Sequence, residues 1–334
     1  MAATSRLLES ARAHADRTEA LEAEPAKVAH MVSLRPTILM LSLLVCAAAQ
    51  AQDRGTLDPR PLPPLAHPGD PKTPAKELFG RAPGPAALEP EPIGFYSHGC
   101  LAGAQALPAN GPSWQVMRLS RGRYWGHPDL IAFLERLAPP AAQAAGWPGL
   151  LIGDISQPRG GPMLTGHASH QIGLDADIWL TPMPGRELSR AEREEMSATN
   201  VVREDRLDVD PEIWTEGHMA VLRTAAQSPQ VQRIFVNAAI KRALCRQATG
   251  DRRWLAKVRP MFGHDYHFHV RLFCPRGAES CKDQDGVPPG DGCDASLSWW
   301  FTEEALHPKK STKTWPPMTM AGLPAECRQV LTAR

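Results

Sequence analysis

The sequence predicts a single α+β domain with a small, largely antiparallel central sheet, flanked by helices and loops and stapled by disulfides. Short helix and strand patterns alternate along the chain without the regular spacing of βαβ units, and no internal repeat is visible. Six of the seven cysteines lie beyond residue 51, in the part of the chain that we expect to remain after export. A chain of 334 residues is long enough to bury a substantial core.

The predicted elements follow from hydrophobic periodicity and from cap signals. Pro128 opens an amphipathic helix that continues to residue 137. Ser189 and Glu192 form a capping-box pattern at the start of a charged helix. The remaining predictions are strands at 150–154 and 233–236 and helices at 214–226 and 238–245.

Residues 31–51 have the features of a secretory signal peptide. Arg35 precedes an apolar run, and Ala49 and Ala51 supply the small residues of a cleavage site, so we expect cleavage after Ala51. The run is well short of the roughly 20 residues that span a bilayer, so no stable membrane anchor is predicted; a permanent anchor is the alternative. Residues 1–30 form an upstream extension, and Met31 is a candidate for the true start.

Composition divides the rest of the chain into three parts. Residues 52–92 are dense in proline and predict an extended linker, 93–327 predict the compact domain, and 328–334 predict a tail. Lys plus Arg number 37 against 36 for Asp plus Glu, so the charge gives no case for a nucleic-acid partner or an anionic membrane surface.

Removing the leader also removes Cys46 and leaves an even number of cysteines. They are Cys100, Cys245, Cys274, Cys281, Cys293 and Cys327. An even count in an exported chain predicts disulfides, although buried thiols or a second metal site remain alternatives. Six cysteines permit about 15 pairings, and spacing alone does not choose among them.

Five of the 12 histidines fall in two short windows, residues 166–180 and 263–274. In the second window, alternation puts His267, His269 and Arg271 on one face of a strand. In the first, Asp177 lies on the polar face of another strand, and the chain must fold back at Gly173 to bring His170 near it.

Histidine clusters with adjacent carboxylates predict a metal site carried by the central sheet. Two neutral histidines and one aspartate on Zn²⁺ leave a position open for water, which is a catalytic arrangement. The alternative is a polar-faced strand with solvated aspartates. The HExxH motif of the common zinc proteases is absent.

The pattern His-x6-Asp at 170–177, followed by His-x-His at 267–269, resembles the zinc peptidases grouped with lysostaphin and the D-alanyl-D-alanine metallopeptidases. Among them the chain is most similar to the penicillin-insensitive murein endopeptidases, over about residues 93–301. Supporting segments include IGFYSHGCLAGA, RIFVNAAIKRALC and KVRPMFGHDYHFHVRLFCP.

The resemblance implies roles for particular residues. The zinc ligands would be His170, Asp177 and His269, and the catalytic histidines would be His267 and His264. The latter two would orient or deprotonate the zinc-bound water that attacks the peptide carbonyl and stabilise the oxyanion. For His264, a loop histidine that only lines the cleft is the alternative.

Further metal-binding residues of the family would correspond here to His167 and Asp205. Asp208 stands where a histidine is expected, which counts against a second metal, and His167 could instead support Asp177 or His170. Arg271 would meet a substrate carboxylate or serve surface packing. The implied disulfides are Cys100 with Cys327, Cys245 with Cys293, and Cys274 with Cys281.

The implied activity is that of a periplasmic peptidoglycan hydrolase that cuts the D-alanyl to meso-diaminopimelyl cross-link. A carboxypeptidase or dipeptidase of the same group, trimming a terminal D-Ala, is one alternative. A non-catalytic wall-binding protein is another, and the presence of both His264 and His267 argues against it.

Overall fold

The computed structural model describes residues 54–309 and 316–334. The predicted signal peptide and the upstream extension lie outside the described residues. Among the residues described, no helix is long and apolar enough to cross a membrane.

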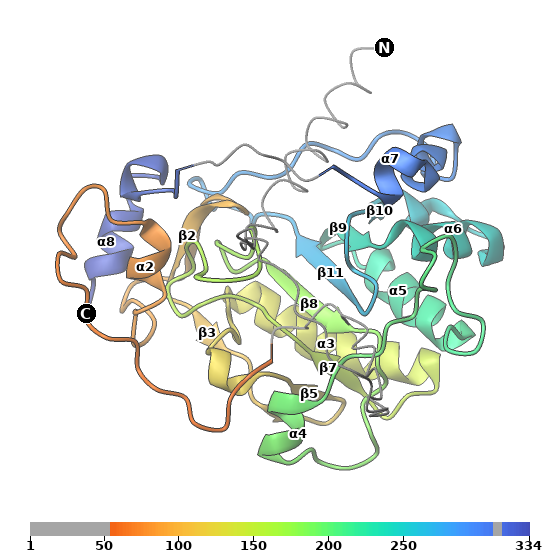
Figure 1. The fold of residues 1–334 in the computed structure, drawn as a ribbon, viewed down its shortest axis with the longest axis horizontal. Helices are drawn as coiled ribbons and strands as arrows, with labels where there is room; N and C mark the ends of the chain where they lie inside the picture. Colours follow the sequence, from red (N-terminus) through yellow and green to blue (C-terminus); the bar gives the residue numbers. More distant parts are fainter. Residues whose placement is uncertain (1–53, 310–315) are drawn as a thin grey trace, which may run out of the picture.

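A seven-stranded sheet forms the centre of the molecule (Figure 1). In spatial order its strands are β10 (Val258–Pro260), β9 (Val231–Val236), β11 (His267–Leu272), β8 (Asp175–Trp179), β7 (Leu150–Ile152), β5 (Trp114–Val116) and β4 (Asn110–Gly111). Two smaller sheets pair β1 (Glu91–Phe95) with β2 (His98–Ala102), and β3 (Gln105–Ala106) with β6 (Trp125–Gly126).

The α+β class is confirmed, but the sheet is mixed and larger than predicted. Strands β10 and β9 are parallel, as are β5 and β7, whereas the other neighbours are antiparallel. Parallel neighbours need a crossover connection. Here α6 (Ala238–Gln247) connects β9 to β10, and α3 (Pro128–Ala145) connects β5 to β7. The expectation of a small, largely antiparallel sheet missed these two units because β5 and β10 are only three residues long.

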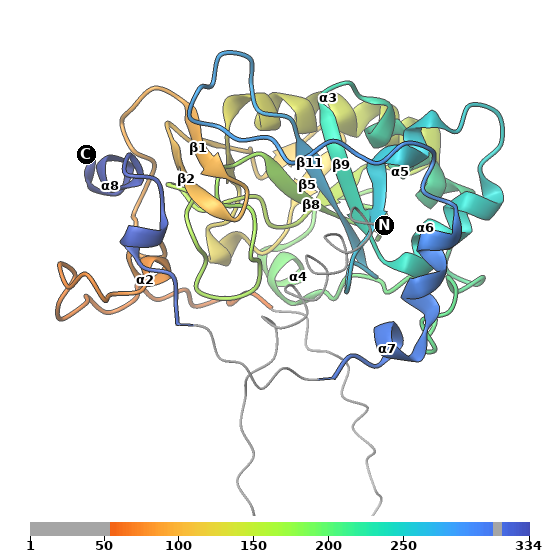
Figure 2. The same cartoon turned by 90° about the horizontal axis from the view of Figure 1, so that it is seen from above.

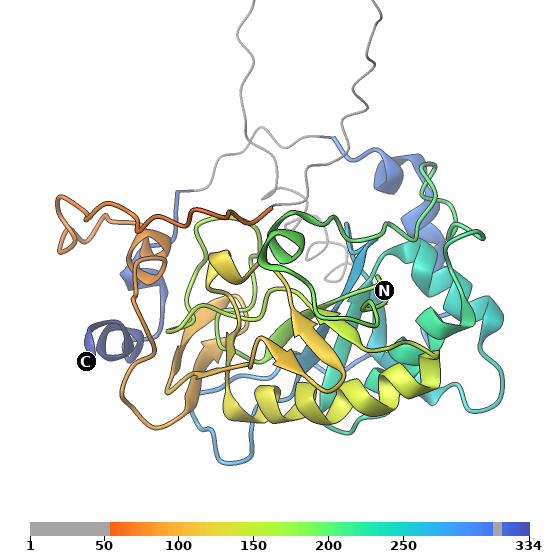
Figure 3. The same cartoon turned by 90° about the horizontal axis from the view of Figure 1, so that it is seen from below.

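The helices cover the sheet and close its edges. Figures 2 and 3 show α3 along one side of the sheet, where it packs against α5 (Glu216–Gln227). The predicted cap of α4 (Arg190–Glu195) is present, since Ser189 and Glu192 exchange the two hydrogen bonds of a capping box. The other helices are α2 (Ala75–Phe79), α7 (Glu303–Leu306) and α8 (Cys327–Thr332), with short 3₁₀ turns at Leu119–Arg121, Arg253–Lys257, Ala295–Phe301 and Met320–Gly322.

Three disulfides join the pairs that the family resemblance implied. Cys100–Cys327 ties β2 to α8, Cys245–Cys293 ties α6 to the segment before Ala295, and Cys274–Cys281 closes the loop that follows β11. The α carbons of the pairs are 5.6 to 5.9 Å apart, the normal span of a disulfide.

The proline-rich segment differs from an extended linker in its second half. Ala75, Phe79 and Ala86 are buried in a cluster with the Cys100–Cys327 disulfide and with Val330. Helices α2 and α8 accordingly lie side by side at one end of the molecule (Figure 1). The predicted tail at 328–334 is in large part this second helix. Composition predicted neither feature, because α2 and α8 belong to one apolar cluster although they are more than 200 residues apart in sequence.

Candidate metal centre

Strands β8 and β11 bring the two histidine windows together. They are antiparallel neighbours, and their register places His269 directly opposite Asp177. Residues on both faces of the two strands are buried, so the predicted polar face is covered rather than solvated. Cross-strand partners have closely spaced side chains, and this register therefore accounts for the contact between the two windows.

His170 reaches the same point from the loop before β8. Gly173 has a φ of 68°, which permits the predicted chain reversal, and His170 itself has a φ of 68°. His264, before β11, is also left-handed at 54°. Left-handed backbone in non-glycine residues is uncommon and collects at functional sites, and two site histidines adopt it here.

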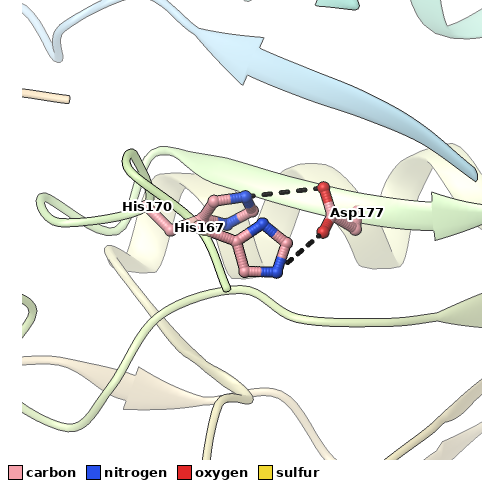
Figure 4. Close-up of side chains that lie close together, drawn as sticks. All are labelled: His167, His170 and Asp177. Carbon is pink, nitrogen blue, oxygen red and sulfur yellow. Dashed lines mark ion pairs between the residues drawn. The ribbon is translucent and has the colours of Figure 1, made fainter. Parts of the chain in front are cut away.

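Four histidine side chains converge on Asp177, and Figure 4 shows two of them, His167 and His170. The distance from His170 Nε2 to Asp177 Oδ1 is 3.4 Å, and His269 Nδ1 lies 3.4 Å from the same oxygen. His167 Nε2 lies 3.4 Å from the other oxygen, Oδ2. The ligand atoms of His167, His170 and Asp177 all lie within 4.8 Å of one another.

The hydrogen bonding of His170 leaves one nitrogen ready for a metal. Its Nδ1 lies 2.6 Å from the carbonyl oxygen of Ile155 and donates to it, so Nε2 carries the lone pair. Within the described chain, His170 Nε2 and Asp177 Oδ1 are both buried without a hydrogen-bond partner. Burial lowers the pKa of His170, which keeps the imidazole neutral. Two orphaned buried acceptors facing each other fit a cation between them.

Asp175, which sequence reasoning missed, lies behind the ligand positions. Its carboxylate accepts hydrogen bonds from Arg271 Nε at 2.8 Å and Nη2 at 3.1 Å, and from the backbone N–H of His170 at 3.1 Å. Its Oδ1 lies 3.0 Å from His269 Nε2, although not in hydrogen-bond geometry. A carboxylate beside Nε2 favours the tautomer with its proton there and the Nδ1 lone pair toward Asp177.

Arg271 is therefore not available to a substrate carboxylate, nor is it a surface residue. The side chain is buried, bound to Asp175 and to Gln284 Oε1, and stacked 4.0 Å from the ring centre of Tyr96. Strand alternation correctly predicted that Arg271 shares a face of β11 with His267 and His269. At this end of β11, however, that face is covered by protein.

Asp154 is the second carboxylate that sequence reasoning missed. It contacts Arg121 at 2.6 Å, Arg123 at 2.9 Å and His167 Nε2 at 3.0 Å. Burial by itself would raise the pKa of Asp154. The hydrogen bond from His167 and the two guanidinium groups outweigh this effect, so the pKa lies below its ordinary value and Asp154 is ionised. When His167 donates its Nε2 proton to Asp154, that nitrogen is not free to bind a metal. The geometry thus favours the supporting role of His167 beside Asp177.

His264 and His267 lie next to the ligand positions. His264 Nδ1 donates to the carbonyl oxygen of Phe262 at 2.8 Å, which leaves Nε2 as its basic nitrogen. The ring centres of His264 and His267 are 4.9 Å apart, and His267 Nε2 lies 3.7 Å from Asp177 Oδ1. Burial lowers the pKa of His267 to about 4 and that of His264 well below its ordinary value, so both are neutral near pH 7.

The family model of the penicillin-insensitive murein endopeptidases matches residues 92–332. The chain belongs to this family. It is 48% identical over 244 residues to the penicillin-insensitive murein endopeptidase of Haemophilus influenzae, covering 72% of this chain and 82% of that protein. The Pectobacterium atrosepticum protein of the same name is 42% identical over 260 residues, covering 78% of this chain and 89% of the relative.

Membership in the family makes the chain a peptidase that hydrolyses peptidoglycan. The resemblance drawn from the two histidine windows is confirmed at the level of the family.

Asp205 is not among the residues that the fold gathers around Asp177 in the described chain. Its exposed carboxylate pairs with Arg203, two residues away, and Asp208 pairs with Arg246 at 3.1 Å. Both aspartates are thus engaged with arginines of their own surroundings. This arrangement does not favour a second metal that uses Asp205.

A cavity of about 130 Å³ opens beside the histidines of the endopeptidase. The residues that line it include His167, Asp177, His267, Arg121, Trp179 and Tyr266. A larger cavity of about 720 Å³ lies between the proline-rich segment and α8, lined by none of the site histidines. The smaller cavity is the relevant one for chemistry because it contains Asp177.

Proposed function

We propose that this murein endopeptidase is zinc-dependent and hydrolyses the D-alanyl to meso-diaminopimelyl cross-links of peptidoglycan. The single observation that carries the metal proposal is the pair of buried, unpartnered acceptors, His170 Nε2 and Asp177 Oδ1, 3.4 Å apart. His269 Nδ1, at 3.4 Å from the same oxygen, completes a set of two histidines and one carboxylate. This donor set is typical of catalytic zinc.

Zn²⁺ bound there would supply a positive charge that polarises the scissile carbonyl and lowers the pKa of water. In this proposal His170, Asp177 and His269 are the ligands. His264 Nε2 accepts a proton from the attacking water and passes it to the leaving amine. His267 holds the developing oxyanion from its position beside Asp177.

The same arrangement accounts for insensitivity to penicillin. A β-lactam inhibits a peptidase by acylating its nucleophilic side chain and leaving a stable acyl-enzyme. With water as the nucleophile, no side chain becomes acylated. Because the proposed mechanism has no covalent acyl-enzyme step, it explains why penicillin would not inhibit the enzyme.

We also propose that residues 31–51 direct export and that the mature chain works in the periplasm, where its substrate lies. Three disulfides within the described chain support an oxidising compartment. N-terminal sequencing of the mature protein from the periplasmic fraction tests this part. A mature chain that still begins before residue 31 would contradict it.

The activity is tested by digesting purified cross-linked dimer muropeptide with the mature chain, after removal of metal and after addition of Zn²⁺ or Mg²⁺. We expect zinc-dependent conversion of dimers to monomers, about one tightly bound zinc, and loss of activity in His267→Ala. His307→Ala, at an exposed histidine outside the site, is the matched control. Release of terminal D-Ala from intact dimers would indicate a carboxypeptidase, and zinc binding without any cleavage would indicate a wall-binding protein.

A further inference from the structure

Tyr266 immediately precedes β11, and its backbone and ring both make contacts beside the candidate metal centre. Its carbonyl accepts a hydrogen bond from Leu180 N at 2.9 Å, and its ring packs against a small apolar cluster that includes Trp179. The ring centre lies 4.6 Å from that of His267. The side chain is thus held between the sheet and one of the site histidines.

The side chain of Tyr266 lines the same cavity as Asp177 and His267. Within the described residues its hydroxyl has no hydrogen-bond partner. The buried hydroxyl of Tyr96, by contrast, donates to the carbonyl oxygen of Leu272 at 2.6 Å. A partly buried phenol usually finds a partner, so a hydroxyl without one in a cavity-lining residue is available to a ligand.

Three other side chains that line this cavity are engaged with protein groups. Arg121 is paired with Asp154, and His167 contacts the same carboxylate. Arg118 donates to the carbonyl oxygens of Arg193 and Met196. Tyr266 is therefore a neutral donor at this cavity whose hydroxyl makes no hydrogen bond within the described residues.

The charges around Tyr266 keep its proton in place. Burial, and then the carboxylates of Asp177 and Asp265, raise the pKa of Tyr266 to about 12. The hydroxyl therefore remains a hydrogen-bond donor at every pH at which a peptidase of this kind would work. It cannot serve as a general base there, because its conjugate anion is not populated.

We propose that Tyr266 is a further catalytic residue of this endopeptidase, whose hydroxyl donates a hydrogen bond to the scissile carbonyl oxygen as negative charge develops on it. The proposal rests on the proposed hydrolysis of a peptide bond in this cavity. Water supplies the hydroxyl that adds to the carbonyl carbon, the C–N bond breaks, and the water's proton leaves on the amine. Tyr266 keeps its own proton and forms no covalent bond, so the balance of the reaction is unchanged.

The test is Tyr266→Phe, which removes one oxygen and keeps the ring packing. We expect kcat on dimer muropeptide to fall by about 100-fold, as for loss of one oxyanion donor elsewhere, with KM and bound metal within about twofold of wild type. Tyr124→Phe is the matched control, because Tyr124 stacks on Trp125 and does not line the cavity. Its kcat should be unchanged.

A second readout does not depend on turnover. The affinity for a phosphinate analogue of the D-alanyl–diaminopimelyl bond should fall in Tyr266→Phe by a factor similar to the fall in kcat/KM, whereas affinity for the product peptide should not change. An unchanged kcat would overturn the proposal, as would a loss explained by lower metal content or by a lower Tm. If wild type fails to cleave dimers, the endopeptidase proposal is wrong. If wild type cleaves them and Tyr266→Phe binds the phosphinate equally well, only the proposal for Tyr266 is wrong.

Discussion

Replacing Asp175 by Asn tests whether the carboxylate behind the histidines holds the site together. Asp175 is fully buried and accepts two hydrogen bonds from Arg271 and one from the backbone of His170, and it also faces His269 Nε2. Asn keeps the shape and one acceptor oxygen, but it leaves the buried guanidinium without a counter-charge. Breaking a buried pair in this way costs about 3 kcal/mol or more.

The expected loss can be measured in the metal-free protein. For a domain of this size, a loss of about 3 kcal/mol corresponds to a fall in Tm of about 6 to 12 °C. Asp175→Asn should also weaken metal binding by about 10- to 100-fold, because the residue orients both histidines. Arg271 holds the pKa of Asp175 below its ordinary value against the effect of burial, so the contribution is present above about pH 4 and is lost as pH falls through the folded-state pKa.

A double-mutant cycle separates the charge effect from simple cavity formation. Asp175→Asn with Arg271→Met removes both charges, so the double variant should be less destabilised than the sum of the two single variants by about 1 kcal/mol or more. Asp251→Asn, at an exposed pair with Arg253, should leave the stability unchanged within the error of the measurement. The reasoning would be refuted if the stability losses of the two single variants added up to the loss in the double variant. It would also be refuted if Asp175→Asn had wild-type stability and metal affinity.

Three further predictions concern other parts of the molecule. Burial, followed by Arg259, lowers the pKa of Lys241 to about 7. Above pH 7 the unfolded chain still holds a proton that the folded chain has released, so the free energy of unfolding should rise by about 2 to 3 kcal/mol between pH 7 and 9. Urea unfolding measures this rise, and Lys241→Met should abolish it. Removing Cys100–Cys327 by paired Ser substitutions should lower the free energy of unfolding by about 5 kcal/mol, and removing Cys274–Cys281 should lower it by about 2.5 kcal/mol. The difference is expected because the sequence separations are 227 and 7. Equal losses would contradict the chain-entropy account. His167→Ala should weaken metal binding by about 10- to 100-fold, whereas His170→Ala should abolish it, as measured by titration with a zinc indicator; equal loss in both would make His167 a ligand.

The sequence by itself determined the chemistry and the local structure. The two histidine windows, the alternation in 267–272 and the carboxylates of the first window pointed to one site, because strand periodicity and residue type are local properties. The capping box at Ser189 and the helix that begins at Pro128 were readable for the same reason. The disulfide pairing came from the family resemblance, since spacing allows many pairings.

The tertiary structure decided what depends on residues distant in sequence. The register of β8 with β11 sets His269 opposite Asp177, and it also turns Arg271 inward onto Asp175. The parallel strands and the packing of α2 against α8 likewise depend on partners that no local pattern contains. The supporting roles of Asp154 and Asp175 were missed because sequence alone does not show whether a carboxylate on or beside a strand is buried or solvated. Burial and pairing across the sheet are properties of the folded chain, and they determine which polar residues serve the site.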